Sequence, residues 1–257
     1  VGQLLEAIDR LAPSSLAEEW DNVGLTVGRH NQSVRRLMVA LELRDEVMVE
    51  AEQGEFDGVL VHHPPIFPSL EAVSDDRPAS ELVLRAAESR TAIIAAHTNL
   101  DSAPGGLNDV MAGLLGIADP APLTPSGADP TAGLGRIGRI EPTGVAELAG
   151  EVGRVFDAPT TFSGDAWTSV RTLACCTGSG AGLIPEAREL GADAYVTSDL
   201  KYHDADRALG LPLIGVPHAA VEQLALEVWT RSLARTLGAE GVDVVFAQSP
   251  TYPWQRT

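Results

Sequence analysis

The chain has 257 residues, of which 44% are hydrophobic and 21% charged, and this composition is typical of a soluble globular protein with one large or two small domains. The formal net charge of −18 argues against binding to nucleic acid or to an anionic membrane, because the arginines are scattered and Lys201 is the only lysine. The chain does not start like a signal peptide, and no apolar run approaches the ~18 residues of a membrane span. The two cysteines, Cys175 and Cys176, are neighbours and form no disulfide framework, so we expect a cytoplasmic protein.

Apolar runs predict alternating helices and strands in the first half of the chain. The expected helices are 4–11, 45–53, 80–88 and 107–115, and the expected strands are 37–41, 56–61 and 91–96. The strands are short and almost wholly apolar, as buried parallel strands are, and their alternation with helices predicts right-handed βαβ units. We also expect the long loop 64–78 to form a lid or the wall of a site.

A proline-rich segment in the middle of the chain has the composition of a linker. It covers residues 117–132, and we place a domain boundary inside it. After it, the expected strands are 134–140, 158–162, 170–176, 194–196, 213–217 and 242–246, and the expected helices are 145–156, 184–190 and 218–237. The glycine-rich run 177–182 lacks the spacing of phosphate-binding loops, which favours a tight turn.

The predicted fold class is α/β, with two α/β domains whose mixed, largely parallel sheets are flanked by helices. The first domain is discontinuous and comprises residues 1–125 and 218–257, and the second comprises residues 126–217.

Two histidines, His62 and His63, directly follow the strand 56–61. Ligands of open α/β sheets bind at the carboxyl ends of the strands, and Pro64 and Pro65 would hold the two imidazoles there. Because successive residues on a strand face opposite ways, adjacent histidines suit two neighbouring ions better than one. The alternative is a structural pair that caps the strand.

Other strand ends carry further candidate ligands. Asp101 follows the strand 91–96 and can chelate or bridge a cation, although this loop alone favours an Asx turn. His97, in the same loop, can be a metal ligand, orient a ligand or contact a substrate. His218 and Glu222 lie one helical turn apart, as in helical zinc motifs, but the pair alone is also an ordinary surface feature.

Two weaker groups are candidates to line the same cleft. Asp199 and His203 are four residues apart at a helix entrance, where a capping Asp and an exposed His are equally ordinary. Asp21 and Asn22 belong to the loop 18–25, which can also be explained as a turn anchored by a buried Trp20.

The strongest set combines imidazoles and carboxylates from three strand ends. It consists of His62, His63, Asp101, His218 and Glu222. Mixed nitrogen and oxygen ligands suit zinc, iron, manganese or cobalt better than copper(I) or an iron–sulfur cluster, and one bridging carboxylate lets five ligands hold two ions. We therefore expect two divalent metal ions per chain, in a cleft between the two domains.

These residues resemble the Nif-three-like dinuclear metal-centre proteins, also known as GTP cyclohydrolase 1 type 2 homologues. The motifs span nearly the whole chain and are Trp20 to Leu25, His62-His63-Pro64, His97 to Asp101, Ala103 to Gly106, Asn108-Asp109, Ser198-Asp199, Tyr202-His203, and His218 with Glu222. The resemblance implies a two-domain α/β fold, a toroidal homohexamer, and a dinuclear site whose ligands are the five residues of the strongest set. The chain departs from the family pattern at Thr197-Ser198-Asp199, Pro217-His218-Ala219 and Val221, but it keeps both His218 and Glu222.

The metal site predicts a metal-dependent hydrolase that acts on a nucleotide or a related small molecule. Two ions would lower the pKa of bound water and polarise the bond under attack. We expect His97 to be the catalytic group that transfers a proton or orients the substrate. The resemblance implies GTP cyclohydrolase type 2-like chemistry, although the chain has no guanine-reading motif. The alternative is a non-catalytic metal-binding regulatory or scaffold protein that acts as a ring.

Overall fold

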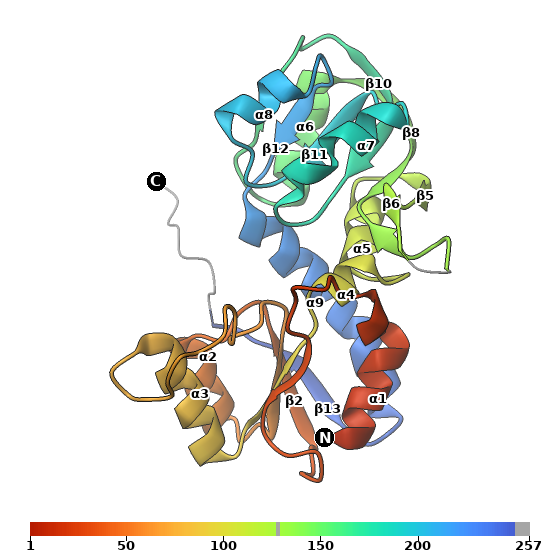
Figure 1. The fold of residues 1–257 in the computed structure, drawn as a ribbon. Coiled ribbons are helices and arrows are strands. Elements are labelled where there is room, and N and C mark those ends of the chain that lie inside the picture. The colour runs from red at the N-terminus through yellow and green to blue at the C-terminus, as the bar shows by residue number, and fades with distance from the viewer. Residues whose placement is uncertain (127–128, 250–257) are drawn as a thin grey trace. The chain divides into compact units, whose positions relative to one another are not determined.

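A computed structural model describes residues 1–126 and 129–249 of the chain (Figure 1). These residues form two compact units: unit 1 comprises Val1–Leu100 and the chain from Leu226 onward, and unit 2 comprises Asp101–Ala225. The boundaries predicted at residues 125 and 217 both lie inside unit 2. At residue 125 the reason is that helix α5 (Leu107–Leu114) packs Met111 and Ala112 into the core of unit 2, and at residue 217 it is that Val221 joins the same core.

Unit 1 is built on a largely parallel five-stranded sheet. Its strand order is β1 (Gly24–Val27), β4 (Ala92–Ala95), β3 (Gly58–Val61), β2 (Arg36–Ala40) and β13 (Asp243–Phe246). Strands β4, β3, β2 and β13 are parallel, as the alternation of helices and strands predicts, and β1 is antiparallel to β4. Strand β1 lies at the end of the segment expected to be a loop.

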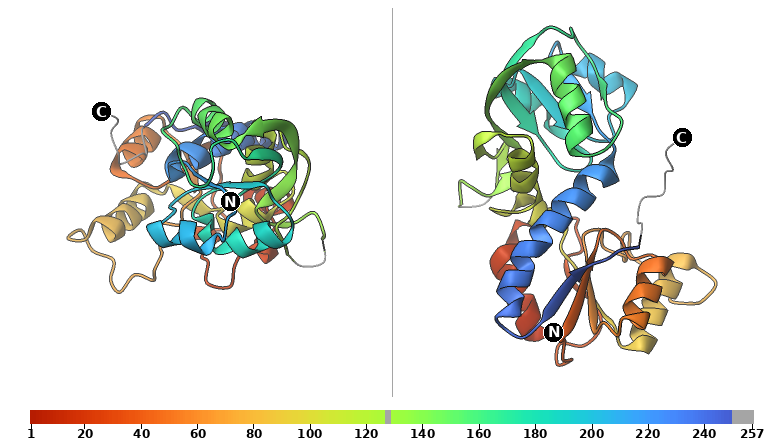
Figure 2. Two further views of the ribbon diagram at one scale, coloured as in Figure 1. Left: turned by 90° about the horizontal axis from the view of Figure 1, so that it is seen from above. Right: turned by 180° about the vertical axis from the view of Figure 1, so that it is seen from behind.

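Helices cover both faces of this sheet. Figure 1 and the rear view in Figure 2 show α2 (Asp45–Gln53) and α3 (Pro78–Ser89) on one face, and α1 (Gly2–Leu11) with the later turns of α9 (His218–Gly238) on the other. The first two pack buried apolar side chains such as Val47 and Ala86 against the strands. A short 3-10 helix, η1 (Ser14–Leu16), follows α1. The two-layer cover explains why the central strands are almost wholly apolar.

Unit 2 contains a mixed six-stranded sheet. Its order is β5 (Ala118–Ala121), β8 (Arg136–Gly144), β10 (Ser169–Cys175), β11 (Ala194–Thr197), β12 (Leu213–Gly215) and β9 (Thr161–Phe162). Only β10, β11 and β12 run parallel, and the other neighbours are antiparallel. Side chains alternate across the sheet, so Leu173 and Cys175 join one core cluster while Ala174 joins the other.

The remaining helices of unit 2 fall on the two faces of this sheet. Helix α6 (Val145–Val155) packs on the first cluster with α5, and α7 (Ile184–Glu189) contributes to the second, as does Ala208, which directly follows α8 (Tyr202–Arg207). A 3-10 helix, η2 (Gly180–Leu183), precedes α7, and helix α4 (Thr98–Ser102) spans the division between the two units.

The proline-rich segment 117–132 is not a linker. Its described residues include strands β5 and β6 (Thr124–Pro125), and β6 pairs with β7 (Gly133–Leu134). Residues 127 and 128 lie outside the described part of the chain. The proline in β5, Pro120, is tolerated because β5 is an edge strand and does not need every backbone N–H for the ladder.

A buried ion pair fixes the beginning of unit 2. The guanidinium of Arg136, whose side chain is fully buried, bonds the carboxylate of Asp109 through Nε and through Nη2, the latter at 3.0 Å. Its Nη1 donates to the carbonyls of Gly133 and Gly135 at 2.6 and 2.7 Å. One side chain therefore ties α5 to the β7–β8 turn. Among the described residues, no helix combines the length and apolar character needed to cross a membrane.

Candidate functional site

The two adjacent histidines of unit 1 lie at the carboxyl end of β3, as predicted. His62 is buried, and its Nδ1 lies 2.9 Å from the backbone oxygen of Ala96, just past the end of the neighbouring strand β4. His63 places Nδ1 3.2 Å from the carboxylate of Glu42, which follows β2 and is also bonded by Arg44. Each imidazole is therefore oriented by the end of an adjacent parallel strand.

His97 is oriented by the loop before β1. The antiparallel register pairs Gly24 with Ala95, so Asp21 returns beside the residues that follow β4. The Nδ1 of His97 lies 2.9 Å from Oδ1 of Asp21, and the other oxygen of that carboxylate accepts hydrogen bonds from the amide, at 3.0 Å, and the hydroxyl of Thr98. Burial opposes ionisation of Asp21, but the hydrogen bonds from His97 and Thr98 outweigh it and hold the pKa of this carboxyl well below its usual range.

The three imidazoles of unit 1 form one cluster. Ring centroids are separated by 5.1 Å for His62–His63, 5.1 Å for His62–His97 and 5.6 Å for His63–His97. One ring nitrogen from each lies within 4.8 Å of the other two. A carbonyl or carboxylate oxygen only accepts hydrogen bonds, so each neutral ring carries its proton on Nδ1 and its lone pair on Nε2. Such anchoring through Nδ1 is typical of metal-binding histidines.

The loop with Asp21 also binds the long loop after the histidines. The side-chain amide of Asn22 donates to the carbonyl of Ile66 at 2.8 Å. The ring of Trp20 contacts that of Phe67 at a centroid distance of 5.6 Å and that of His97 at 6.0 Å. Trp20 is 55% exposed, so the alternative explanation of this loop as a turn anchored by a buried Trp20 is wrong. Its neighbour Asp21 makes the buried contact instead.

A second group of polar residues lies in unit 2 at the start of α9. Nε2 of His218 is 2.8 Å from Oε2 of Glu222, and Nδ1 is 2.6 Å from Oδ2 of Asp199. Burial disfavours the charged imidazole, but the two carboxylates outweigh it and raise the pKa of His218 to about 9. Asp199 can hold this position because it adopts a φ of 54°, which turns the chain sharply after β11.

A glycine makes room for the carboxylate of Glu222. Gly178 follows β10 with a φ of 62°, and a Cβ at this position would lie 2.5 Å from Oε1 of Glu222 and 3.4 Å from Nε2 of His218. Any other residue would therefore displace the carboxylate or strain the backbone. The glycine-rich run forms a turn, as expected, and the turn has the further role of leaving space beside a candidate ligand pair.

Asp101 lies in the short helix α4 rather than in a loop. Its Oδ1 accepts a hydrogen bond from the hydroxyl of Thr177 at 2.9 Å. The buried side chain of Asn108 bridges the same two residues, because Nδ2 donates to the carbonyl of Asp101 at 3.1 Å and Oδ1 accepts from the amide of Thr177 at 3.0 Å. The carboxylate is thereby oriented relative to the end of β10.

The structure thus brings the predicted residues together in two groups. Unit 1 gathers His62, His63 and His97 with Asp21 and Asn22, and unit 2 gathers His218 and Glu222 with Asp199. His203 is exposed on α8, where it lies 3.8 Å from Asp206 and against the ring of Tyr202.

Three residues with supporting roles were not predicted: Glu42, Asn108 and Thr177. Glu42 and Thr177 each follow a strand at its carboxyl end, and this position could have revealed them in the sequence.

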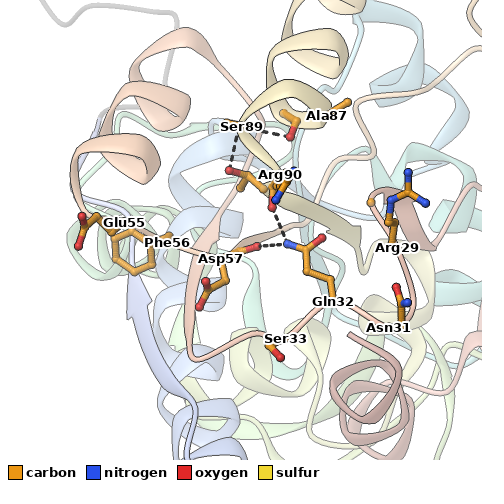
Figure 3. Close-up of a pocket in the computed structure, with 13 residues that line it drawn as sticks. Arg29, Asn31, Gln32, Ser33, Glu55, Phe56, Asp57, Ala87, Ser89 and Arg90 are labelled. Atoms are coloured by element: carbon orange, nitrogen blue, oxygen red, sulfur yellow. Dashed lines mark hydrogen bonds between the residues drawn. The ribbon is translucent and has the colours of Figure 1, made fainter.

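A separate pocket of about 970 Å³ lies at the opposite edge of the unit 1 sheet. Its lining includes residues that precede the strands, and Figure 3 shows Gln32 at its centre, hydrogen-bonded to the carbonyls of Asp57 and Arg90. Because parallel α/β sheets bind ligands at the carboxyl ends of their strands, we place the candidate site at the histidines and not in this pocket.

Comparisons with known proteins identify the relatives of this chain. The model of the family Duf34/NIF3 (NGG1p interacting factor 3) matches residues 1–253. This chain belongs to the Duf34/NIF3 family. A relative from Streptococcus pneumoniae serotype 4, called GTP cyclohydrolase 1 type 2 homolog, is 31% identical and aligns over 98% of this chain and 97% of its own length.

A further relative and a solved structure are also similar to this chain. A protein of the same name from Streptomyces coelicolor is 32% identical over 99% of this chain and 93% of its own length. The crystal structure of a Bacillus cereus protein related to NIF3 superposes with a TM-score of 0.91 at 23% identity, covering 99% of this chain and 98% of that one. The predicted two-part α/β fold is therefore the fold of the Duf34/NIF3 family.

Proposed function

We propose that this Duf34/NIF3 protein binds two divalent metal ions and hydrolyses a nucleotide or a related small molecule. The observation that carries the proposal is the cluster of three imidazoles that are each anchored through Nδ1. Anchoring through Nδ1 leaves Nε2 of each ring to act as a metal ligand. Gly178 leaves space beside the carboxylate of Glu222, which can then act as a ligand as well. Imidazole and carboxylate donors fit zinc, iron, manganese or cobalt.

The proposed ligands come from both units. They are His62 and His63 of unit 1, and Asp101, His218 and Glu222 of unit 2. When bound, such ions act as Lewis acids that activate water and polarise the bond under attack. The backbone of Ala96, the carboxylate of Glu42 and that of Asp199 hold the three ligand imidazoles in place.

His97 has the properties of a proton-transfer group. Its Nδ1–H is held by the ionised carboxylate of Asp21, which keeps the lone pair on Nε2 and would stabilise the imidazolium after Nε2 takes a proton. The proton that Nε2 receives can then pass to the leaving group. Asp21 acts on the reaction only through His97 and is a positioning residue.

The name of the relatives gives the first substrate class to test. Proteins called GTP cyclohydrolase 1 type 2 homolog align with almost the whole chain, and we extend that class of substrate, a guanine nucleotide, to this protein as part of the proposal. The family description as an interacting factor favours a second candidate function, a metal-binding scaffold without turnover.

Metal analysis and a hydrolysis assay separate these two functions. We expect about two ions per chain by elemental analysis and turnover of GTP or another nucleotide by the metal-loaded protein. Glu222→Ala should lose both metal and turnover, whereas Glu227→Ala, an exposed residue on the same helix, should lose neither. Bound metal with no turnover on any nucleotide would favour the scaffold, and no bound metal under any loading condition would refute both.

The role of His97 requires a different variant. His97→Gln should keep the metal content of the wild type and lower kcat by about 100-fold or more, as expected for removal of a general acid–base. If this variant loses metal as well, His97 is a ligand.

A homohexameric state and a cytoplasmic location complete the proposal. Both cysteines are free and buried, which is consistent with a reducing compartment. Sedimentation velocity of the purified chain should give the mass of six subunits, and a smaller species at micromolar concentration would contradict the ring.

A further inference from the structure

Two large aromatic side chains are exposed next to the histidine cluster of unit 1. Trp20 is 55% exposed and Phe67 is 51% exposed, although each offers a large apolar area that proteins ordinarily bury. Their ring centroids lie 5.6 Å apart and the rings are tilted by 51°. The two rings therefore support each other and leave part of their faces open to solvent. We call this pair the aromatic ledge.

The ledge is held in a fixed position relative to His97. The Trp20 ring meets the His97 ring edge-on at 6.0 Å, with an interplanar angle of 75°. The next two residues secure this position, because Asp21 binds Nδ1 of His97 and Asn22 donates to the carbonyl of Ile66, which precedes Phe67. Both rings are thus anchored by hydrogen bonds through residues adjacent to them in the chain.

The surroundings of the ledge determine which part of a ligand it can take. Glu18 and Glu19 immediately precede Trp20 and are both exposed. Their carboxylates disfavour a phosphate group near the ring faces, since like charges repel. An uncharged planar ring is not repelled by these carboxylates and is stabilised by stacking on the aromatic faces. Stacking of bases on aromatic side chains depends on the π-face and not on a particular pattern of hydrogen bonds.

We propose that Trp20 and Phe67 form a subsite that stacks the base of a nucleoside or nucleotide beside His97. The inference rests on the proposed function, because it assigns a binding position to the base of the proposed substrate. The reacting bond of that substrate would lie at the histidine cluster. It assigns a role to two residues that neither bind metal nor transfer protons.

The test measures binding of nucleosides, which lack phosphate and so report the base alone. The probes are guanosine, adenosine and cytidine, with ribose as the control without a base, and binding is measured by calorimetry on metal-loaded and on chelator-treated protein. The variants are Trp20→Leu and Phe67→Leu, which keep apolar bulk but remove the ring. Trp20→Phe restores a ring, and Trp167→Leu removes a tryptophan of unit 2 that is 88% exposed.

We expect at least one nucleoside to bind and ribose not to bind. Each leucine variant should weaken nucleoside binding by about tenfold, Trp20→Phe should retain most of it, and Trp167→Leu should match the wild type. Thermal melting of every variant establishes that the fold is intact. If one leucine variant does not fold, the other leucine variant and Trp20→Phe still test the inference.

Three results would overturn the inference. They are no binding of any of the three nucleosides at millimolar concentration, equal binding by wild type and both leucine variants, or a change of oligomeric state in these variants with nucleoside binding unchanged. The last would show that the ledge contacts another copy of the chain. Ring-dependent nucleoside binding by a protein that holds no metal and has no turnover would support the subsite while refuting the hydrolase.

Discussion

Replacing Asp21 by Asn should destabilise the protein while changing only one atom of the side chain. The two carboxylate oxygens accept hydrogen bonds from the His97 imidazole and from the amide and hydroxyl of Thr98, and the side chain is fully buried. In Asn, an NH2 group replaces one oxygen and must face at least one of these donors. A hydrogen bond to a buried charged group contributes about 1.5–3 kcal/mol, so we expect the free energy of unfolding to fall by about 2 kcal/mol near neutral pH.

The pH dependence gives this prediction a second, independent readout. The folded-state pKa of Asp21 is depressed below its usual value of 3.8, although burial alone would raise it. A depressed pKa contributes stability that is fully present above the unfolded pKa and is lost as pH falls through the folded pKa. The difference between wild type and Asp21→Asn should therefore be complete at neutral pH and shrink below about pH 4.

Urea unfolding followed by circular dichroism measures both effects. With a slope of about 2 kcal/mol per molar, the midpoint should fall by about 1 M urea at neutral pH. Asp9→Asn is the matched control, because Asp9 lies in unit 1 and its exposed carboxylate accepts one bond from the amide of Ser14 at 2.7 Å. Equal losses in Asp9→Asn and Asp21→Asn, or a difference that persists unchanged in acid, would refute the role assigned to the buried carboxylate.

Three further predictions follow from unit 2. Arg136→Lys should lower the free energy of unfolding by about 3 kcal/mol, because one ammonium cannot replace the bonds of the buried guanidinium, whereas Arg139→Lys on the same strand should cost little; urea unfolding measures both. Gly178→Ala should reduce bound metal, measured by elemental analysis, and lower the melting temperature, whereas Gly182→Ala, whose Cβ meets open space, should change neither. Burial raises the pKa of the Cys175 thiol to about 12, so this thiol should react with a disulfide reagent near pH 8 only after unfolding.

Each of these predictions has a contradicting result. For the arginines it is an equal loss of stability in both lysine variants. For the glycines it is unchanged metal content in the first alanine variant, or an equal decrease in both. For the thiol it is rapid modification of the folded protein at the rate of an exposed cysteine.

The histidine positions could be predicted because the strands that carry them are unambiguous. The apolar runs that end at Val61 and Ala96 identify β3 and β4, and parallel neighbours bring their carboxyl ends to one edge. The sequence therefore predicts that His62, His63 and His97 follow strands at one edge of the sheet, and in the structure they form one cluster.

Asp21 could be predicted as a candidate to line the cleft, but its pairing with His97 could not, because this pairing depends on contact between distant segments. Strand β1 has no long apolar run and pairs antiparallel to β4, and only this register brings Asp21 beside His97. The prediction of a linker at the proline-rich segment 117–132 was wrong for a related reason. Composition reports the local preference of the backbone, whereas an edge position in a sheet decides whether Pro120 is tolerated in a strand.

Three consecutive residues in the loop before β1 have three different roles. Trp20 presents a ring, Asp21 holds an imidazole, and Asn22 ties down the loop that carries Phe67. Gly24, paired with Ala95, sets the distance of all three from the sheet. Deletion or insertion of a single residue between 20 and 24 would move Trp20, Asp21 and Asn22 away from the groups that they contact. Chain length in this loop should therefore be under stricter constraint than any one of its side chains.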